Sequence, residues 1–504
     1  MSQPLYFDYA ATTPPDPRVA GAMASWLGGG LFGNAGASHA YGRQARAATE
    51  QARTVVAALI GATPREIVFT SGATEADNLA LLGLVRGLSQ ERGGKPLHLV
   101  CARIEHKAVL DPVRQLVREG HSVTWLDPNS EGVVALDSVL AALRPDTVLV
   151  SLMHANNEIG VIQDVAAVGQ LCRSRGIALH VDAAQSVGKI PVDVERLQVD
   201  LLSISAHKFY GPQGCGALYV RAPWRARLQP LQFGGGQERA LRSGTLPVHQ
   251  IVGMGAAAQI AADELQGEAA RLVVQRERLL AGIAAFGGVV LNGAGAARVP
   301  GILNLSFAGV HGEALLSGLR ELALSTSAAC NADSDETSYV LRAIGRDPLL
   351  AQATLRFSLG RFTTDAEIET AIQVVGRELS RLRALADLDS LEADDGYLGE
   401  AGDIAAGTRI RWQLRCEGGC IVQAAYRAFA SGPVLEVCEW LAAVLPGRSL
   451  AEDLPDEPHA WAQRCAVPPD QLGRLLIVED ALLVARAAAR ANAGPSPVKP
   501  GVFR

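Results

Sequence analysis

Cysteine is scarce in this chain, with eight residues among 504. So few thiols do not suggest a disulfide framework, and we expect a reducing, cytoplasmic environment. No apolar run reaches the ~18 residues that a membrane-spanning helix needs, and the start, MSQPLYFDYAATTPPDP, shows no signal-peptide pattern. Positive charge is not in excess either, since the formal net charge is −6. We therefore expect neither nucleic acid nor a membrane as a partner.

What the chain does have is a regular alternation of strands and helices between about residues 60 and 220. Short, nearly continuous apolar segments such as LHLVCA, VLVSLMH and DLLSIS are separated by longer helical patterns. Such strands are typical of a mostly parallel sheet that is covered by helices on both faces. The sequence therefore predicts an α/β fold.

Two further regions differ from this one in their pattern of predicted strands and helices. Long helical patterns around the short strands ILNLSF and TLRFSL predict a smaller α/β lobe, and the acidic stretch ADLDSLEADDGYLGEAGD predicts a linker before a separate α+β domain. The expected organisation is a large domain over about 15–260, a small domain over about 1–14 and 261–387, a linker over 388–397, a C-terminal domain over 398–493 and a tail over 494–504.

Polar side chains follow several of the predicted strands. Lys208 comes just after DLLSIS, and Asp182 and Gln185 follow IALHV. Ligands of an open parallel sheet bind beyond the carboxyl ends of its strands. Thr74 follows REIVFT at a helix start, where free backbone N–H groups favour a phosphate. Taken alone, each residue has a simpler interpretation: Lys208 as a surface lysine, Asp182 as a turn residue and Thr74 as a helix cap.

Together these residues suit pyridoxal phosphate, which needs a lysine, a carboxylate and a phosphate cradle. At this point the chain, over residues 1 to about 387, resembles the cysteine desulfurases of the aminotransferase class V-like pyridoxal-phosphate enzymes. The motifs that carry the resemblance are YFDYAATTP, FTSGATEADNLA, EHKAVLD, MHANNEIGVIQD, HVDAAQSVGK, SAHKFYGPQGCGALYVR, GGGQERALRSGTLPVHQIVGMG and LRFSLGRFTT. The resemblance implies pyridoxal-phosphate fold type I.

The resemblance also implies roles around the cofactor ring. Lys208 is expected to bind the cofactor aldehyde and to move protons. Asp182 is expected to pair with the pyridine nitrogen, His106 to stack on the ring face and Gln185 to reach the ring hydroxyl. Asn157 is expected to contact both the cofactor and the substrate carboxylate.

Further roles concern the phosphate and the substrate. The expected phosphate ligands are Ala73, Thr74, Ser205 and His207, with Thr245 reaching the cofactor of a neighbouring subunit, so the resemblance implies a homodimer. Arg356 is expected to bind the carboxylate of L-cysteine, because a guanidinium can contact both oxygens.

Cys330 lies in the segment ALSTSAACNADSDETSYVL, among small and polar residues that predict a loop with little packing. A desulfurase needs a thiolate that takes sulfur as a persulfide and carries it to an acceptor protein or small thiol. We therefore expect Cys330 to be this nucleophile. A selenocysteine lyase remains an alternative, although the loop length argues against it. The other cysteines that lie in apolar or glycine-flanked contexts, Cys101, Cys172, Cys215 and Cys438, are expected to be packed.

The C-terminal domain resembles the iron–sulfur scaffold proteins, through EAGD, FASG, GRSLAED and VPPDQLGRLLIVEDAL. The resemblance places Ala401, Ser431 and Arg474 where that family has its three cysteines, and leaves Asp403 of the usual ligand set. Alanine cannot bind iron, and arginine brings a permanent positive charge. We therefore expect no metal site and a docking or regulatory role. A non-catalytic sulfur-relay or assembly protein is a second alternative.

Overall fold

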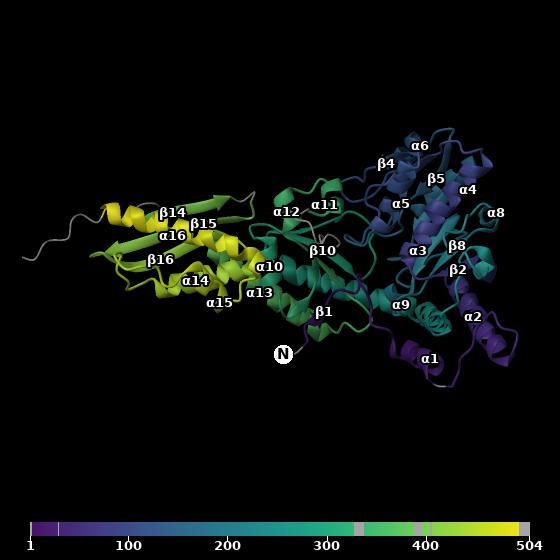
Figure 1. The fold of residues 1–504 in the computed structure, drawn as a ribbon, viewed down its shortest axis with the longest axis horizontal. Helices are drawn as coiled ribbons and strands as arrows, with labels where there is room; N and C mark the ends of the chain where they lie inside the picture. Colours follow the sequence, from purple (N-terminus) through teal and green to yellow (C-terminus); the bar gives the residue numbers. More distant parts are fainter. Residues whose placement is uncertain (1–2, 29, 327–336, 388–395, 404–405, 493–504) are drawn as a thin grey trace, which may run out of the picture.

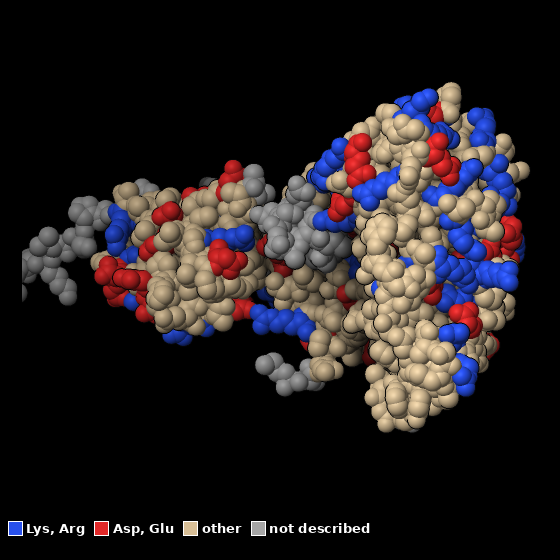
Figure 2. All heavy atoms as spheres, turned by 45° about the vertical axis from the view of Figure 1, so that its right-hand side comes forward, with Lys and Arg blue, Asp and Glu red and all other residues tan. Residues whose placement is uncertain are grey.

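The computed structural model describes residues 3–28, 30–326, 337–387, 396–403 and 406–492. Cys330 lies outside these ranges. The chain forms a wide lobe, a smaller central lobe and a C-terminal unit that follow one another along the long axis of the molecule (Figure 1). On the face drawn in Figure 2, basic and acidic side chains are intermixed over the wide lobe.

The wide lobe contains a seven-stranded sheet in which β8 runs antiparallel to both of its neighbours, β2 and β7, and the remaining pairs are parallel. The predicted mostly parallel sheet is confirmed. In spatial order the strands are β2 (Ile67–Thr70), β8 (Gly216–Val220), β7 (Leu201–Ser205), β6 (Ala178–Asp182), β5 (Thr147–Ser151), β3 (His98–Ala102) and β4 (Ser122–Leu126).

Helices cover both faces of this sheet because its strands are buried on both sides. One apolar core lies under α2 (Ala40–Leu59), α6 (Leu136–Ala142), α7 (Val165–Arg175) and the first half of α9 (Val248–Ala284). The other lies under α3 (Ala73–Asn78), η2 (Leu79–Gly83), α4 (Leu84–Glu91), α5 (Lys107–Arg118) and α8 (Ala222–Arg225). Outside these two layers lies α1 (Pro17–Leu27), which packs against α9.

The central lobe is built on a four-stranded antiparallel sheet. Its strands in order are β12 (Ser325–Thr326), β13 (Thr354–Ser358), β10 (Ile302–Phe307) and β9 (Val289–Leu291), and a separate parallel pair joins β1 (Leu5–Tyr6) to β11 (Leu322–Ala323). The helices of this lobe are α10 (Gly312–Gly318), α11 (Tyr339–Ala343), α12 (Pro348–Gln352) and α13 (Asp365–Asp387). The N-terminal strand therefore belongs to the same lobe as residues more than 300 positions later in the chain.

The C-terminal unit is a three-stranded antiparallel sheet with helices on one face. It consists of β14 (Tyr397–Asp403), β15 (Thr408–Glu417), β16 (Cys420–Phe429), α14 (Gly432–Val444), α15 (Pro458–Arg464) and α16 (Leu472–Asn492). Strand β14 was not predicted, since its first residue fell in the expected linker. The structure accommodates its glycines because α16 packs directly on them: a Cβ on Gly399 would lie 2.1 Å from the backbone nitrogen of Ala485.

The C-terminal unit and the central lobe share one continuous apolar core, which runs from Phe307 and Leu315 to Trp412 and Leu441. Their contact is tight at the start of α14, where a Cβ on Gly432 would lie 2.8 Å from the Cβ of Ser317 on α10. The ion pair between Arg320, two residues after the end of α10, and Glu436 on α14 lies nearby, with 3.2 Å between nitrogen and oxygen. The unit therefore packs directly against the central lobe.

Candidate active site

Three of the predicted site residues lie at the carboxyl ends of neighbouring strands. Asp182 is the last residue of β6, Ser205 is the last residue of β7, and Lys208 ends the short 3₁₀ turn that follows β7. Strands β6 and β7 are parallel and adjacent, so their carboxyl ends meet at one edge of the sheet. The structure therefore brings these residues together.

Lys208 is positioned by the N-terminal segment of the chain. Its Nζ donates to the carbonyl oxygens of Ala10 and Ala11, both at 2.7 Å. The Ala10 carbonyl also accepts from Nε2 of Gln185 at 2.8 Å, and Oε1 of Gln185 accepts from Nζ of Lys189 at 2.5 Å. Lys208 and Gln185 thus share one backbone acceptor.

Lys189 is a site residue that the sequence did not single out. Burial lowers the pKa of its ammonium group to about 7, and the positive charges of Lys208 and Arg356 act in the same direction. Lys189 therefore lies close enough to Lys208 for their charges to interact, and it donates to Gln185 directly. Its place within the motif HVDAAQSVGK, four residues after Gln185, was the available signal.

Asp182 is a buried carboxyl among other acidic groups. Burial and, to a smaller extent, the Asp77 carboxyl raise its pKa to about 6, against the opposing effects of the N–H of Ala184 and the rings of His106 and His180. Asp77 is itself fully buried, with its Oδ1 3.3 Å from Nε2 of His180. A cationic group placed at Asp182 would stabilise the ionised carboxylate here.

His106 caps α5, and its Nδ1 accepts from the backbone N–H of Ala108 at 3.1 Å. Burial lowers the pKa of the imidazole, Asp182 opposes this shift, and Lys208 adds to it. The imidazole is therefore neutral near pH 7. Both Asp182 and Lys208 are close enough to affect it, so the structure places His106 at the same strand ends.

The expected phosphate cradle lies where α3 begins. Ala73 and Thr74 are the first two residues of α3, and Gly72 before them has φ 156° and no side chain. A Cβ on Gly72 would come 3.9 Å from Oγ of Ser205, so the start of α3 and the end of β7 face each other. The ring of His207 contacts Oγ1 of Thr12 through Nδ1 at 3.0 Å, and burial lowers its pKa to about 4.

The segment that carries Thr245 is anchored at two points. Glu238 is buried, accepts from both terminal nitrogens of Arg53 at 2.7 Å, and accepts from the N–H of Phe69 on β2 at 2.7 Å. Arg242 pairs with Glu75 in the first turn of α3 at 2.8 Å. Thr245 itself is exposed.

Arg356 lies on β13 and is nearly buried. Its Nη2 donates to Oδ1 of Asp8, its Nη1 donates to the carbonyl oxygen of Asn157, both at 2.8 Å, and its Nε is buried without a hydrogen-bond partner. Oδ1 of Asn157 is likewise buried without a partner. Asp8 was missed from the sequence, because the contact joins residues that lie 348 positions apart.

The two flanks of the segment that contains Cys330 are anchored beside Arg356. Ser325, before the segment, donates its hydroxyl to Oδ2 of Asp8 at 2.9 Å. Ser338, after it, donates to Oε2 of Glu158 at 2.5 Å and caps α11. Burial raises the pKa of Glu158 to about 7, and the Ser338 hydrogen bond and Arg356 oppose this shift.

The remaining cysteines agree with expectation where the structure describes them. Cys101, Cys172, Cys215 and Cys438 are buried, as predicted. Cys416 and Cys420 lie in the β15–β16 hairpin on either side of the turn at 418–419. Among the described residues, no group of three or more His, Cys, Asp or Glu side chains is arranged to hold a metal ion.

Known proteins are similar to this chain in sequence and in fold. The aminotransferase class-V family matches residues 5–370. A cysteine desulfurase IscS of Aeromonas hydrophila is 55% identical over 396 residues, which is 78% of this chain and 97% of the relative. This chain belongs to the cysteine desulfurase family.

Solved structures agree with this assignment. A NifS-like protein superposes with a TM-score of 0.69 at 36% identity, covering 75% of this chain and all of that one. A structure described as SspA in complex with cysteine superposes with a TM-score of 0.63 at 37% identity, covering 71% of this chain and all of that one. The fold is therefore pyridoxal-phosphate fold type I, as predicted, and the chain is a pyridoxal-phosphate-dependent cysteine desulfurase. Strands β14–β16 and the helices after them lie beyond the matched range of the family.

The site residues fit pyridoxal phosphate, the cofactor of the cysteine desulfurases. The neutral ring of His106 lies close enough to the Lys208 amine and the buried Asp182 carboxyl for both to affect its pKa. At the start of α3, Gly72 has no side chain between the helix and Ser205. A protonated ring nitrogen beside Asp182 would favour the ionised carboxylate and so oppose the effect of burial on its pKa. When bound, the cofactor supplies an electron sink for chemistry at the amino acid's carbon atoms.

Within the described ranges, none of the helices combines the length and the apolar character that crossing a bilayer requires.

Proposed function

We propose that this desulfurase transfers the sulfur of L-cysteine to the thiol of Cys330 and releases L-alanine. The carbon–sulfur bond of the substrate breaks and a sulfur–sulfur bond forms, so the thiol becomes a persulfide and no external oxidant is needed. The persulfide sulfur then passes to an acceptor protein or small thiol, in iron–sulfur cluster assembly or in other sulfur transfer. The observation that carries this proposal is the anchoring of both flanks of the Cys330 segment beside Arg356.

Arg356 and Asn157 are proposed to hold the substrate carboxylate. Nε of Arg356 and Oδ1 of Asn157 are both buried without partners, and a buried polar atom without a partner is costly. The guanidinium can donate to a carboxylate, while Asp8 and the Asn157 carbonyl keep it in place. A substrate held in this way would lie next to Ser325 and Ser338, between which the chain carries Cys330.

Proton transfer is proposed to depend on Lys208. Its Nζ lies at the carboxyl edge of the sheet, where the carbonyl groups of Ala10 and Ala11 orient it. His106, neutral because burial lowers its pKa, can cover one face of the cofactor ring without adding charge. Asp182 is proposed to keep the ring nitrogen protonated, with Gln185 at the ring hydroxyl.

The phosphate is proposed to bind at the start of α3, with Ala73, Thr74, Ser205 and His207. Thr245 is proposed to reach the phosphate of a neighbouring subunit's cofactor, in a homodimer. The exposure of Thr245 on a well-anchored segment supports this role, since it leaves the side chain accessible to a second copy. A reducing cytosol suits a chain whose described cysteines are all free thiols.

The proposal is tested by following the sulfur. After brief incubation of the full-length protein with L-cysteine, alanine should form in the amount of cysteine consumed, and mass spectrometry should find one added sulfur on the peptide that contains Cys330. Added sulfur on another cysteine would contradict the role of Cys330. Much faster turnover of L-selenocysteine without a persulfide would instead indicate a selenocysteine lyase.

We also propose that the C-terminal unit is a scaffold-like domain that has lost its cluster ligands and now docks on its own desulfurase. Three of the relevant positions cluster at one end of the unit: β14 ends at Asp403, Ser431 precedes α14 and donates to Gln471 at 2.5 Å, and Arg474 lies in the first turn of α16. Ala401 lies on β14 near the same end. Arg474 is 3.7 Å from Glu313 on α10, so this end faces the central lobe.

The expected result for this unit is that it binds no cluster. Full-length protein given ferrous iron and L-cysteine without oxygen should show no visible absorption of a cluster bound by residues 398–493, because alanine, serine and arginine replace the thiolates. The matched control is the variant in which Ala401, Ser431 and Arg474 are all replaced by cysteine. A stable cluster in the unmodified protein, lost in Asp403→Ala, would refute the proposal.

A further inference from the structure

Lys189 lies at the candidate active site, although none of the proposed roles uses it. It belongs to the turn at 184–189 that follows β6, and its Nζ donates to Oε1 of Gln185 at 2.5 Å. The turn brings the two side chains together, since they are four residues apart and the N–H of Lys189 donates to the carbonyl oxygen of Ser186 at 3.0 Å. An amine is therefore directed at the side chain that is proposed to reach the cofactor's ring hydroxyl.

The acceptor that the structure gives Lys189 is an amide oxygen rather than a carboxylate. The acidic side chain that acts on its amine, Glu268, accepts from Nε of Arg361 at 2.9 Å. Burial lowers the pKa of the Lys189 amine to about 7, and the charge of Lys208 acts in the same direction. A buried amine in such surroundings is unfavourable. A methionine would fill the same space without this cost, so the contact with Gln185 is the feature that accounts for an amine here.

The amide of Gln185 is held at both ends. The residue is buried, its Nε2 donates to the carbonyl oxygen of Ala10 at 2.8 Å, and its Oε1 accepts from Lys189. A carbonyl oxygen can only accept and an ammonium group can only donate, so both contacts require the same orientation of the amide. Without the Lys189 amine the orientation would depend on Ala10 alone, and that carbonyl also accepts from Nζ of Lys208 at 2.7 Å.

This orientation leaves one hydrogen of the Gln185 amide available. An amide nitrogen carries two hydrogens, and the Ala10 carbonyl accepts one of them. Among the described residues, no second acceptor is in contact with Nε2 of Gln185. The remaining hydrogen can therefore be donated to an oxygen on the ring of a bound cofactor. A flipped amide would offer its oxygen instead, which cannot donate.

We propose that Lys189 is a positioning residue that fixes the Gln185 amide, so that its nitrogen and not its oxygen serves the ring hydroxyl of pyridoxal phosphate. Lys189 itself neither binds the cofactor nor transfers a proton to it. This inference rests on the proposed function, since it takes Gln185 as the group that reaches the ring hydroxyl. It gives two neighbouring lysines different tasks: Lys208 carries the cofactor, and Lys189 orients the amide that tunes it.

The test follows the visible absorption of the bound cofactor as pH is varied, in the full-length protein without substrate. A donor at the ring oxygen makes the lysine nitrogen that is linked to the cofactor less basic, because it competes for the same electron density. Lys189→Met should therefore raise the midpoint of this titration by roughly one pH unit. Lys189→Arg keeps a donor and a positive charge, and it should shift the midpoint much less.

A double-mutant cycle shows whether Lys189 acts through Gln185. In a protein that already carries Gln185→Met, Lys189→Met should cause no further shift, because there is no amide left to orient. A shift of equal size in both backgrounds would overturn the proposal, since the charge of Lys189 would then act on Lys208 directly. If Gln185→Met loses the cofactor, equal shifts in Lys189→Met and Lys189→Arg would overturn it instead.

Lys95→Met is the matched control, because it removes the amine of an exposed lysine, and it should leave the midpoint unchanged. Thermal unfolding of each variant is measured without cofactor. A Lys189→Met protein that is less stable but shows no shift that depends on Gln185 would assign Lys189 a purely structural role and overturn the proposal.

Alanine formation separates this inference from the proposed function. Absence of alanine when the unmodified protein is given L-cysteine would refute the proposed function. Normal alanine formation in the unmodified protein, together with a Lys189→Met variant whose cofactor absorption titrates at the unmodified midpoint, would refute the role of Lys189 alone.

Discussion

Lys208→Ala is expected to lower alanine formation from L-cysteine by about a thousandfold or more, since it removes both the covalent anchor of the cofactor and the group that moves protons. The structure offers no other amine at the end of β7 among the described residues. Nζ of Lys208 is held there by the carbonyl groups of Ala10 and Ala11. Activity and the visible absorption of the bound cofactor should be measured together.

Lys189 is the rival that this experiment must exclude. It is a buried amine whose pKa burial lowers to about 7, and it donates to Gln185, which shares the Ala10 carbonyl with Lys208. Its Nζ donates to the side chain of Gln185. Lys208, in contrast, lies three residues after the end of β7, the strand next to β6. Borohydride reduction followed by mass spectrometry should find the cofactor on the Lys208 peptide. Finding it on the Lys189 peptide, or full activity in Lys208→Ala, would overturn the assignment. Lys95→Ala, at an exposed lysine, is the matched control and should be fully active.

Cys330→Ser is expected to bind cofactor and L-cysteine normally but to form no persulfide, with turnover reduced by a factor on the order of a thousand or more. A serine hydroxyl is almost entirely protonated at neutral pH and is a far weaker nucleophile toward sulfur than a thiolate. A change in the cofactor spectrum on addition of cysteine, together with absence of alanine, would show that the defect lies after substrate binding.

Cys420 provides the matched control, because it is the exposed thiol among the described cysteines. It begins β16 at the hairpin end of the C-terminal unit, and the ten residues of β15 separate that end from the central lobe. At about 3.3 Å per residue this is roughly 30 Å, too far for a side chain to reach Arg356. Cys420→Ser should therefore keep full turnover, and loss of activity in this variant instead of Cys330→Ser would refute the role of Cys330.

Much of the large lobe follows from the sequence because its signals are local. Apolar runs such as LHLVCA and DLLSIS become buried strands, and residues that directly follow them must lie at the same edge of a parallel sheet. This reasoning was enough to bring Asp182 and Lys208 together, whereas Ser205 was expected from the resemblance. The helical segment EADNLALLGLVRGL is interrupted by the π-helical turn η2. The backbone of residues 227–229 packs there so closely that Gly83 and Gly87 have no room for a Cβ.

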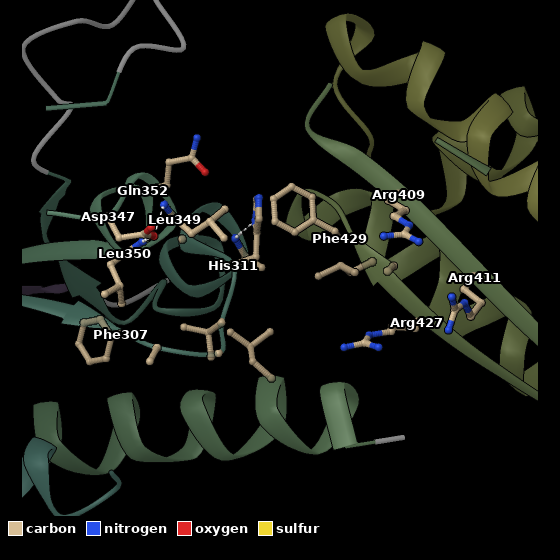
Figure 3. A pocket seen from close by; sticks show the side chains of 18 of the residues that line it. Phe307, His311, Asp347, Leu349, Leu350, Gln352, Arg409, Arg411, Arg427 and Phe429 are labelled. Atoms are coloured by element: carbon tan, nitrogen blue, oxygen red, sulfur yellow. Dashed lines mark hydrogen bonds between the residues drawn. The ribbon is translucent and has the colours of Figure 1, made fainter. Parts of the chain in front are cut away.

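The C-terminal unit shows where local signals fail. Strand β14 has the sequence YLGEAGD, with two glycines and two acidic residues, which by local propensity predicts a turn. Its pairing with β15 and the packing of α16 against Gly399 override that propensity. The groove between α12 and β16 (Figure 3) could not be predicted either, because residues of the central lobe and of the C-terminal unit line it together.

The sequence by itself determined the family, the fold class, the strand-end residues and the identity of Cys330 as the candidate nucleophile, since each depends on residue type and on neighbours along the chain. The tertiary structure alone decided that Asp8 orients Arg356, that Ser325 and Ser338 fix the two flanks of the Cys330 segment, and that Arg474 faces Glu313. These contacts join residues that are about 160 to 350 positions apart. No local pattern encodes such pairs, because they form only when separately folded elements are packed into one core.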